Sequence, residues 1–219
     1  PLPSSVDKTG EQQVFYVWFD ALIGYMTAVG YGGDRCDVHS SDQLWPADIH
    51  IVGKEIVRFH AVYWPAFLMA AGLPLPKCVY AHGWLLFQKD KMSKSKGNIV
   101  RTEPIDKVVG IEPLRYYLLR EIVFGQDGTF SYDSLVGRYN SDLANGLGNM
   151  VSRTLSMLHK YFNGMVPECE HKSDIGAAAR QAIRETIDHF EKFEFSRGLE
   201  SIWALLAKMD KHIVQKKPW

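Results

Sequence analysis

Two short apolar runs that end in glycine, with a helical pattern between them, constrain the fold more than any other feature of the sequence. The first run covers residues 49–53 and the second covers residues 77–83. Between them, apolar side chains over residues 56–70 recur at intervals of three and four, which is the spacing of one helical face. Because the order strand, helix, strand is that of a βαβ unit, the sequence predicts a parallel sheet.

Other patterns extend this picture along the chain. A β-branched and aromatic run over residues 13–18 predicts a buried strand before the βαβ unit. Pro65 is expected to kink the predicted helix, because its ring removes a backbone donor. Later helical patterns cover residues 113–122, 132–139, 142–162, 174–193 and 196–214. The expected fold is an α/β parallel-sheet region over residues 1–130, followed by an all-α helical bundle over residues 131–219.

Composition excludes several classes of protein. The 219 residues include 25 Lys plus Arg and 25 Asp plus Glu, so a uniformly basic nucleic-acid binder is excluded, although a local basic patch stays open. The sequence contains no run of about 18 apolar residues, so it predicts no membrane span. Cys36, Cys78 and Cys169 are widely spaced and odd in number, which favours free thiols in a reducing compartment over a disulfide framework or a zinc site.

The most specific stretch is the pentapeptide Lys91-Met92-Ser93-Lys94-Ser95. Five cations and one anion lie between residues 88 and 101, and the serines together with Gly97 favour a mobile loop over a helix. Such a loop can close on a polyphosphate and match the charge that builds on its leaving group. A solvated basic loop is the alternative, and composition alone leaves both open.

A second candidate site combines aromatic side chains with one polar ring. Ile56, His60 and Trp64 are spaced four apart and share one helical face, and Trp18 and Tyr25 flank the end of a predicted strand and the start of a helix. Such a box of aromatic and aliphatic side chains suits a thioether, which is soft and polarizable and favours contact with aromatic edges. Spacing alone favours the alternative, an ordinary core with a hydrogen-bonded histidine.

Four further residues carry alternatives of the same kind. Glu55 follows a strand end, where an acid can bind ribose hydroxyls or stabilise a helix N-terminus. Asn149 and Arg153 are four apart on one helix face, a spacing that by itself favours a solvated polar pair. Trp219 follows two lysines and a proline; the lysines would favour phosphate, and the ring can also act as a hydrophobic cap on the helical bundle.

Several strings resemble one known family. The pentapeptide 91–95 is identical to the signature loop of class I aminoacyl-tRNA synthetases. Three longer strings resemble the methionyl-tRNA synthetases within that class, and they cover residues 18–25, 53–65 and 142–149. The resemblance covers nearly the whole chain and is least clear over residues 1–12 and 163–195.

The resemblance implies a Rossmann-like half-domain followed by an anticodon-binding domain, and an enzyme that ligates methionine to its tRNA through methionyl-adenylate. ATP with Mg²⁺, methionine and the methionine tRNA are the implied ligands, without a zinc site on this chain. Catalytic roles are implied for Lys91 and Lys94. Methionine contacts are implied for Trp18, Ala21, Leu22, Tyr25, Ile56, His60 and Trp64. ATP contacts are implied for Gly53, Glu55, His82, Gly83, Trp84, Lys91, Met92, Ser93 and Lys94. Anticodon contacts are implied for Asn149, Arg153 and Trp219.

The chain also departs from that family. It has no His-Ile-Gly-His string and no cysteine cluster, Lys96 stands where an aliphatic residue is more frequent, and the chain stops at Trp219. We therefore expect the second half of a catalytic domain with an incomplete anticodon domain. It would be inactive alone, with the missing N-terminal half as its partner. A non-catalytic tRNA-binding fragment is the alternative. The expected location is the cytoplasm, with an organelle as the open alternative.

Overall fold

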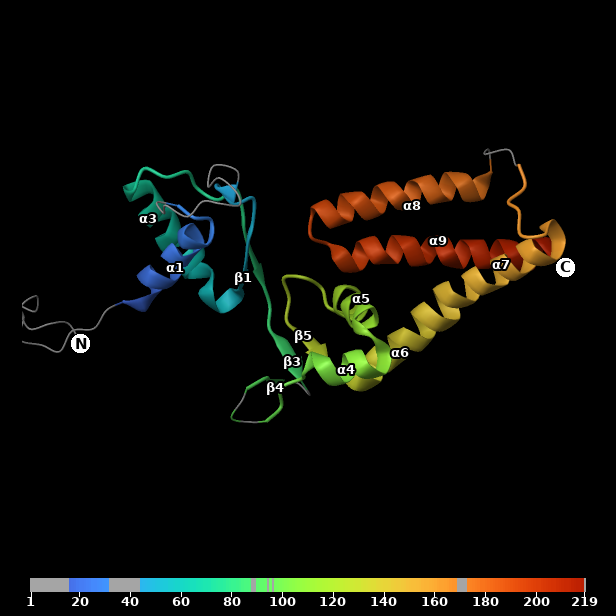
Figure 1. The fold of residues 1–219 in the computed structure, drawn as a ribbon, viewed down its shortest axis with the longest axis horizontal. Helices are drawn as coiled ribbons and strands as arrows, with labels where there is room; N and C mark the ends of the chain where they lie inside the picture. Colours follow the sequence, from blue (N-terminus) through green and yellow to red (C-terminus); the bar gives the residue numbers. More distant parts are fainter. Residues whose placement is uncertain are drawn as a thin grey trace, which may run out of the picture. The chain divides into compact units, whose positions relative to one another are not determined.

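The computed structural model describes residues 16–31, 44–87, 90–93, 95, 97–168 and 173–218 (Figure 1). A small parallel sheet and many helices make up the fold. The chain divides into two compact units, Pro1–His82 and Gly83–Trp219.

The first unit contains the predicted βαβ arrangement. Strands β1 (His50–Gly53) and β2 (Val79–His82) pair in parallel, with His50 opposite Val79 and Gly53 opposite His82. The helical segment between them consists of a 3₁₀ turn η1 (Lys54–Ile56), a π-helical turn η2 (Phe59–Tyr63) and helix α3 (Trp64–Ala70). The strand, helix, strand order read from the sequence is therefore confirmed.

The core of this unit joins helix α1 (Val17–Ala28) to helix α3. Leu22 and Met26 are four apart on α1, and Trp64 and Leu68 are four apart on α3, so each helix presents one row of side chains. All four side chains are buried together with Trp45.

One local prediction meets a different structure here. Val17 and Trp18 begin helix α1, so the strand predicted for residues 13–18 is wrong at these positions, and residues 13–15 lie outside the described part. The run has strand-forming residues, but burial of Leu22 and Met26 at helical spacing decides the local structure. Pro65 lies in the first turn of α3, directly after the π-helical turn, and the kink expected there stays a prediction.

The second unit begins with a three-stranded sheet in the order β4–β3–β5. Strand β3 (Leu85–Phe87) runs antiparallel to β4 (Asp90–Lys91) and parallel to β5 (Gly128–Phe130). Helices α4 (Thr102–Val109) and α5 (Ile111–Glu121) pack beside it. The core of this region, called the sheet-side core below, consists of Ile105, Leu114, Tyr117, Phe130 and Leu135. Neither the small sheet nor α4 was predicted from the sequence.

Helices account for the rest of this unit. They are α6 (Tyr132–Arg138), a π-helical stretch η3 (Tyr139–Gly148), α7 (Asn149–Phe162), α8 (Asp174–Glu191) and α9 (Phe195–Lys216). Figure 1 shows α8 and α9 side by side. They approach closely at Gly198, where a Cβ atom would lie 2.6 Å from the ring of Phe190. The helical segments predicted after residue 131 are confirmed as helices.

Candidate functional site

The centre of the first unit is a buried histidine with both ring nitrogens engaged. His60 is 2% exposed, and its Nδ1 lies 3.0 Å from the carbonyl oxygen of Ile56. Because a carbonyl only accepts, Nδ1 carries the proton, and in the neutral ring Nε2 is then the acceptor. The hydroxyl of Tyr25 lies 2.8 Å from Nε2 and donates to it. Burial raises the pKa of Tyr25, which keeps this donor protonated.

A second buried histidine lies beside the first. The indole N–H of Trp64 donates to Nε2 of His50 at 3.3 Å, and the two side chains are 2% and 6% exposed. The rings of His50 and Tyr25 lie 4.5 Å apart, and those of His50 and His60 lie 6.0 Å apart. Burial lowers the pKa of His50, and the neighbouring His60 lowers it further. Both effects favour the neutral form, whose Nε2 accepts the indole proton.

The structure brings together only part of the predicted methionine set. The rings of Tyr25, His60 and Trp64 form one cluster, and Ile56 contributes its carbonyl group. Leu22 is 1% exposed and belongs to the core, whereas Ala21 is exposed on α1.

The other predicted aromatic residue has a different partner. Trp18 stacks on Phe59, with ring centroids 4.0 Å apart and planes 9° apart.

Three members of this region were missed by sequence reasoning. Trp45 packs at 6.0 Å from the rings of both His50 and Trp64 and donates its indole N–H to the carbonyl of Pro74 at 2.9 Å. Phe59 is the stacking partner of Trp18. His50 is the third missed member. It lies two residues before Val52 on β1, so both side chains point to the same buried face of the strand.

The predicted ribose acid lies at the end of the paired strands. A Cβ atom on Gly53 would lie 2.6 Å from a carboxylate oxygen of Glu55, so this carboxylate folds back over the glycine. Gly53 pairs with His82 at the same edge of the parallel sheet. The carboxyl ends of parallel strands are where open α/β sheets bind ligands, so Glu55 and His82 occupy a suitable edge.

Gly83 and Trp84 begin the second unit under tight steric restriction. A Cβ atom on Gly83 would lie 2.2 Å from the backbone of Gln126, which explains why a glycine stands there. The backbone N–H of Trp84 donates to the carboxylate of Asp127 at 2.8 Å, and its carbonyl accepts from Gly128 at 2.9 Å. This segment is therefore fixed to the chain that leads into β5.

The described part of the lysine loop is attached to the same region. The Nζ atom of Lys91 lies 4.2 Å from the ring centroid of Trp84, which is a cation–π distance. Met92 packs against the sheet-side core. The backbone N–H of Ser93 donates to the side chain of Asn98 at 2.8 Å. Lys94 lies outside the described residues.

The predicted anticodon residues lie on or beyond α7. Asn149 is exposed at the first turn of this helix. The guanidinium of Arg153 donates from Nη1 to the carboxylate of Asp210 on α9 at 2.6 Å, an ion pair that neither alternative drawn from the sequence included. Trp219 lies outside the described residues.

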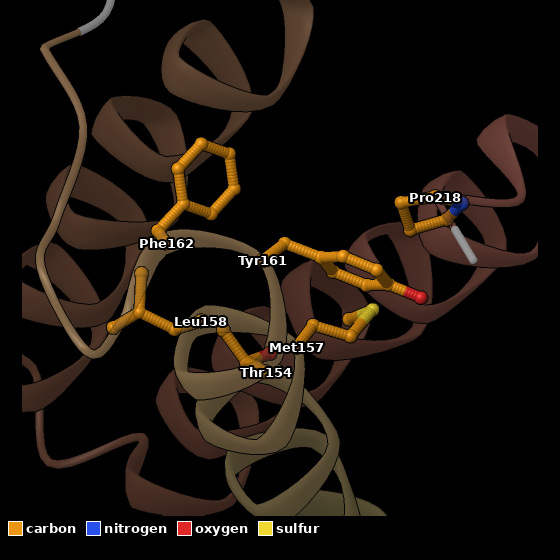
Figure 2. A pocket seen from close by; sticks show the side chains of 6 residues that line it. All are labelled: Thr154, Met157, Leu158, Tyr161, Phe162 and Pro218. Atoms are coloured by element: carbon orange, nitrogen blue, oxygen red, sulfur yellow. The ribbon is translucent and has the colours of Figure 1, made fainter.

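An apolar pocket of about 360 Å³ lies at the carboxyl end of α7. Figure 2 shows its lining side chains, which are Thr154, Met157, Leu158, Tyr161, Phe162 and Pro218. Five of them come from α7 and one follows α9. The pocket therefore adjoins the residue that precedes Trp219.

The string 142–149 contains a partly buried polar junction. Asp142 accepts from the hydroxyl of Tyr116 at 2.7 Å, from Arg138 at 3.2 Å and from Ser141 at 2.7 Å. Burial alone would raise the pKa of Asp142, but the hydrogen bonds from Tyr116 and Ser141, together with Arg138, lower it. Trp203 on α9 donates to the Asp142 carbonyl at 3.3 Å, so this residue joins α5, α6 and α9. Its role in the fold is structural.

The described residues contain neither a metal cluster nor a helix suited to a membrane. No group of three His, Cys, Asp or Glu side chains in this part of the chain gathers closely enough to hold a metal ion. None of the described helices combines the length and the apolar character needed to cross a membrane.

Comparisons with known proteins agree on one family. The model of "tRNA synthetases class I (M)" matches residues 1–155. The chain is 48% identical to a methionine–tRNA ligase of Oceanobacillus iheyensis over 95% of its own length and 31% of that protein. It is 47% identical to methionine–tRNA ligase 1 of Bacillus anthracis, over 95% and 32% of the two lengths. The chain thus spans about a third of the length of these relatives.

A solved structure shows the same likeness in three dimensions. The methionyl-tRNA synthetase of Mycobacterium tuberculosis bound by methionyl-adenylate superposes with a TM-score of 0.85 at 44% identity. The match covers 94% of this chain and 41% of that one.

Proposed function

The chain belongs to the class I tRNA synthetases of the methionine type, and from this membership we propose that it takes part in ligating methionine to its tRNA. In the proposed reaction, the carboxylate of methionine attacks the α-phosphate of ATP, and pyrophosphate leaves. The methionyl group then passes from the adenylate to the 3′ end of the tRNA. We propose this activity for a polypeptide of the relatives' length that contains these 219 residues.

The aromatic cluster of the first unit is the proposed methionine site. Tyr25, His60 and Trp64 carry the argument, because their rings are held in one place by buried hydrogen bonds that leave little rotational freedom. A soft thioether makes favourable contacts with aromatic edges. The remaining proposed members are Trp18, Ala21, Leu22 and Ile56.

The edge of the parallel strands is the proposed ATP site. We propose that Glu55 binds the ribose hydroxyls and that the backbone of Gly53 allows close approach. His82, Gly83 and Trp84 are proposed to contact the adenine ring. The support from this chain is that Gly53 and His82 end neighbouring parallel strands in register.

The lysine loop is proposed to act on the departing pyrophosphate. Negative charge grows on the β-phosphate as the bond to the α-phosphate breaks, so a positioned cation stabilises the transition state more than bound ATP. Lys91 and Lys94 supply these cations, and Met92 and Ser93 connect them. The distance between Lys91 and Trp84 supports a cation held at the loop base.

Mg²⁺ is proposed to accompany the ATP phosphates. The described residues offer no dedicated cluster of three ligands, and Mg²⁺ typically binds through substrate phosphates with few protein carboxylates. When bound, the ion would neutralise phosphate charge. Zinc is not part of the proposal for this chain.

The helices after residue 131 are the proposed tRNA-binding part. We propose a Rossmann-like half-domain over residues 1–130 and an incomplete helical anticodon-binding bundle over residues 131–219. Asn149, Arg153 and Trp219 are the proposed anticodon readers. The packing of α8 on α9 and the link from Arg153 to Asp210 support a continuous helical region. The cytoplasm is the proposed place of action.

Methionine-dependent pyrophosphate exchange tests this function. The assay compares the 219-residue chain alone with a polypeptide extended by the additional segment of its relatives. Exchange by the longer form, with methionine preferred over leucine, supports the ligase. Binding of the methionine tRNA without exchange in either form would instead establish the non-catalytic alternative.

The lysine loop provides the sharper variant. Lys94→Ala should lower the turnover of exchange by the equivalent of about 2–4 kcal/mol while changing the KM for ATP much less. Lys89→Ala removes a neighbouring lysine outside the pentapeptide and serves as the matched control. If Lys94→Ala raises only the KM for ATP, the loop binds ground-state ATP and the catalytic role is wrong.

A further inference from the structure

One side chain closes the base of the lysine loop with both ends of its amide. The Oδ1 atom of Asn98 accepts the backbone N–H of Ser93 at 2.8 Å, and its Nδ2 donates to the backbone carbonyl of Lys91 at 3.2 Å. The two partners flank Met92. Asn98 therefore fixes the direction of the chain at the residue where β4 ends and the loop begins.

Met92, which lies between the two hydrogen-bonded residues, is also restrained by the packing of its side chain. Its side chain is partly buried against the sheet-side core, which is formed by α4, α5, β5 and α6. The amide of Asn98 holds the backbone, and the core holds the side chain. Rotation of the segment 91–93 would break both sets of contacts.

The fixed backbone also determines where the ammonium group of Lys91 lies. Strand β4 has only two residues, and its register pairs Lys91 with Leu86 and Asp90 with Phe87. A strand this short offers few ladder bonds to orient the loop residues after it. The lysine side chain itself is exposed and has a long flexible stem, so its placement over Trp84 depends on the backbone from which it extends.

Chemistry explains why an asparagine suits this position. An amide offers one acceptor and donors on the same short arm. An aspartate in its place would still accept from Ser93, but it would have no proton to give to the Lys91 carbonyl. A leucine has the same branching at Cγ, although it is larger, and makes neither bond.

We propose that Asn98 is a positioning residue of the lysine loop, which holds Lys91 and Ser93 in the orientation needed for attack at the α-phosphate. This proposal rests on the proposed function. It assigns Asn98 no contact with ATP, since its amide is already used on the loop backbone. A misplacement of about 1 Å in a catalytic group can lower a rate on the order of 100-fold.

The test uses Asn98→Leu and Asn98→Asp in the polypeptide that supports pyrophosphate exchange. Asn140→Asp, at an exposed position of η3, makes the same chemical change away from the loop and serves as the control. We expect Asn98→Leu to lower the turnover of exchange about 10- to 100-fold. The KM for methionine and the melting temperature should stay within the range of the control. Asn98→Asp should lie between wild type and Asn98→Leu.

Backbone hydrogen exchange at Ser93 supplies a readout that needs no activity. The amide of Ser93 should exchange faster in Asn98→Leu than in wild type, and it should stay protected in Asn98→Asp, which keeps the acceptor. If Asn98→Leu does not fold, the test uses Asn98→Asp instead. Its turnover should be lower than that of wild type while its melting temperature is unchanged. Unchanged turnover with unchanged Ser93 exchange would overturn the proposal.

The two proposals can fail separately. If the wild-type polypeptide does not catalyse methionine-dependent exchange, the proposed function is wrong, and protection of Ser93 still decides whether Asn98 fixes the loop. If wild type is active and Asn98→Leu retains full turnover, the positioning role is wrong and the function stands.

Discussion

Tyr25→Phe isolates one hydrogen bond at the centre of the aromatic cluster. The substitution removes only the hydroxyl that donates to Nε2 of His60 at 2.8 Å and leaves the ring in place. Because His60 is 2% exposed, water cannot replace the lost donor without moving the surrounding core. Nε2 is thus left as a buried acceptor without a partner.

The expected magnitude depends on that burial. A hydrogen bond between neutral groups contributes about 0.5–1.5 kcal/mol net, whereas a buried polar atom left without a partner costs about 1–3 kcal/mol. The second case applies here, so Tyr25→Phe should lower the free energy of unfolding by about 1–3 kcal/mol. Tyr31→Phe makes the same change on a side chain that is 51% exposed, and we expect an effect within about 0.5 kcal/mol there.

Urea unfolding followed by tryptophan fluorescence measures both variants. A shift in the midpoint at constant slope reports a change in stability alone. Nitrogen chemical shifts of His60 provide an independent check, since Nδ1 should be protonated and Nε2 should carry no proton in wild type. A loss below about 0.5 kcal/mol for Tyr25→Phe, equal to that of Tyr31→Phe, would refute the reasoning, because it would mean that Nε2 is hydrated or turned away.

Three further predictions concern other parts of the chain. The pKa of His50 is lowered in the folded state. The neutral ring therefore contributes fully to stability above about pH 6.5, and this contribution falls as the pH drops below that value. The unfolding midpoints measured at about pH 7.5 and about pH 5.5 should differ less in His50→Gln than in wild type. Gly83→Ala should destabilise the protein by about 3 kcal/mol or more, and Gly53→Ala by less than about 1 kcal/mol, in the same unfolding assay. Trp219→Ala should weaken tRNA charging by about 1–3 kcal/mol while pyrophosphate exchange and melting stay unchanged; a parallel loss in all three measurements would favour the role of a bundle cap.

Local patterns predicted much of the fold because the relevant signal lies within a few residues. The strands over 50–53 and 79–82 and the helices after residue 131 agree with runs and periods read along the chain. The start of α1 at Val17 was missed, since strand-forming side chains there are overruled by packing of the helix one and two turns later. The short strands β3 and β5 were missed because three residues carry too little alternation to be distinguished from a loop.

The candidate site depends on contacts that no local pattern reports. Tyr25 and His60 are 35 residues apart, and Arg153 and Asp210 are 57 apart, yet each pair shares a hydrogen bond. Sequence reasoning placed Tyr25 and His60 in one site without predicting their hydrogen bond, and it found Arg153 without its partner Asp210. The roles in binding methionine, ATP and the anticodon stay predictions, because they require ligands to test.

The two glycines that end the predicted strands show how one sequence signal conceals two physical causes. Both fit a strand that stops at a glycine, and neither adopts the left-handed backbone that would require this residue. At Gly53 a Cβ atom would meet the end of the flexible Glu55 side chain, which can move aside, so the glycine there serves the position of a carboxylate. At Gly83 it would meet the main chain of Gln126, which is fixed by the bonds from Trp84 to Asp127 and Gly128. The first glycine therefore borders a side chain that can move, whereas the second is required by the fold, a distinction that comes only from knowing which atoms lie opposite each one.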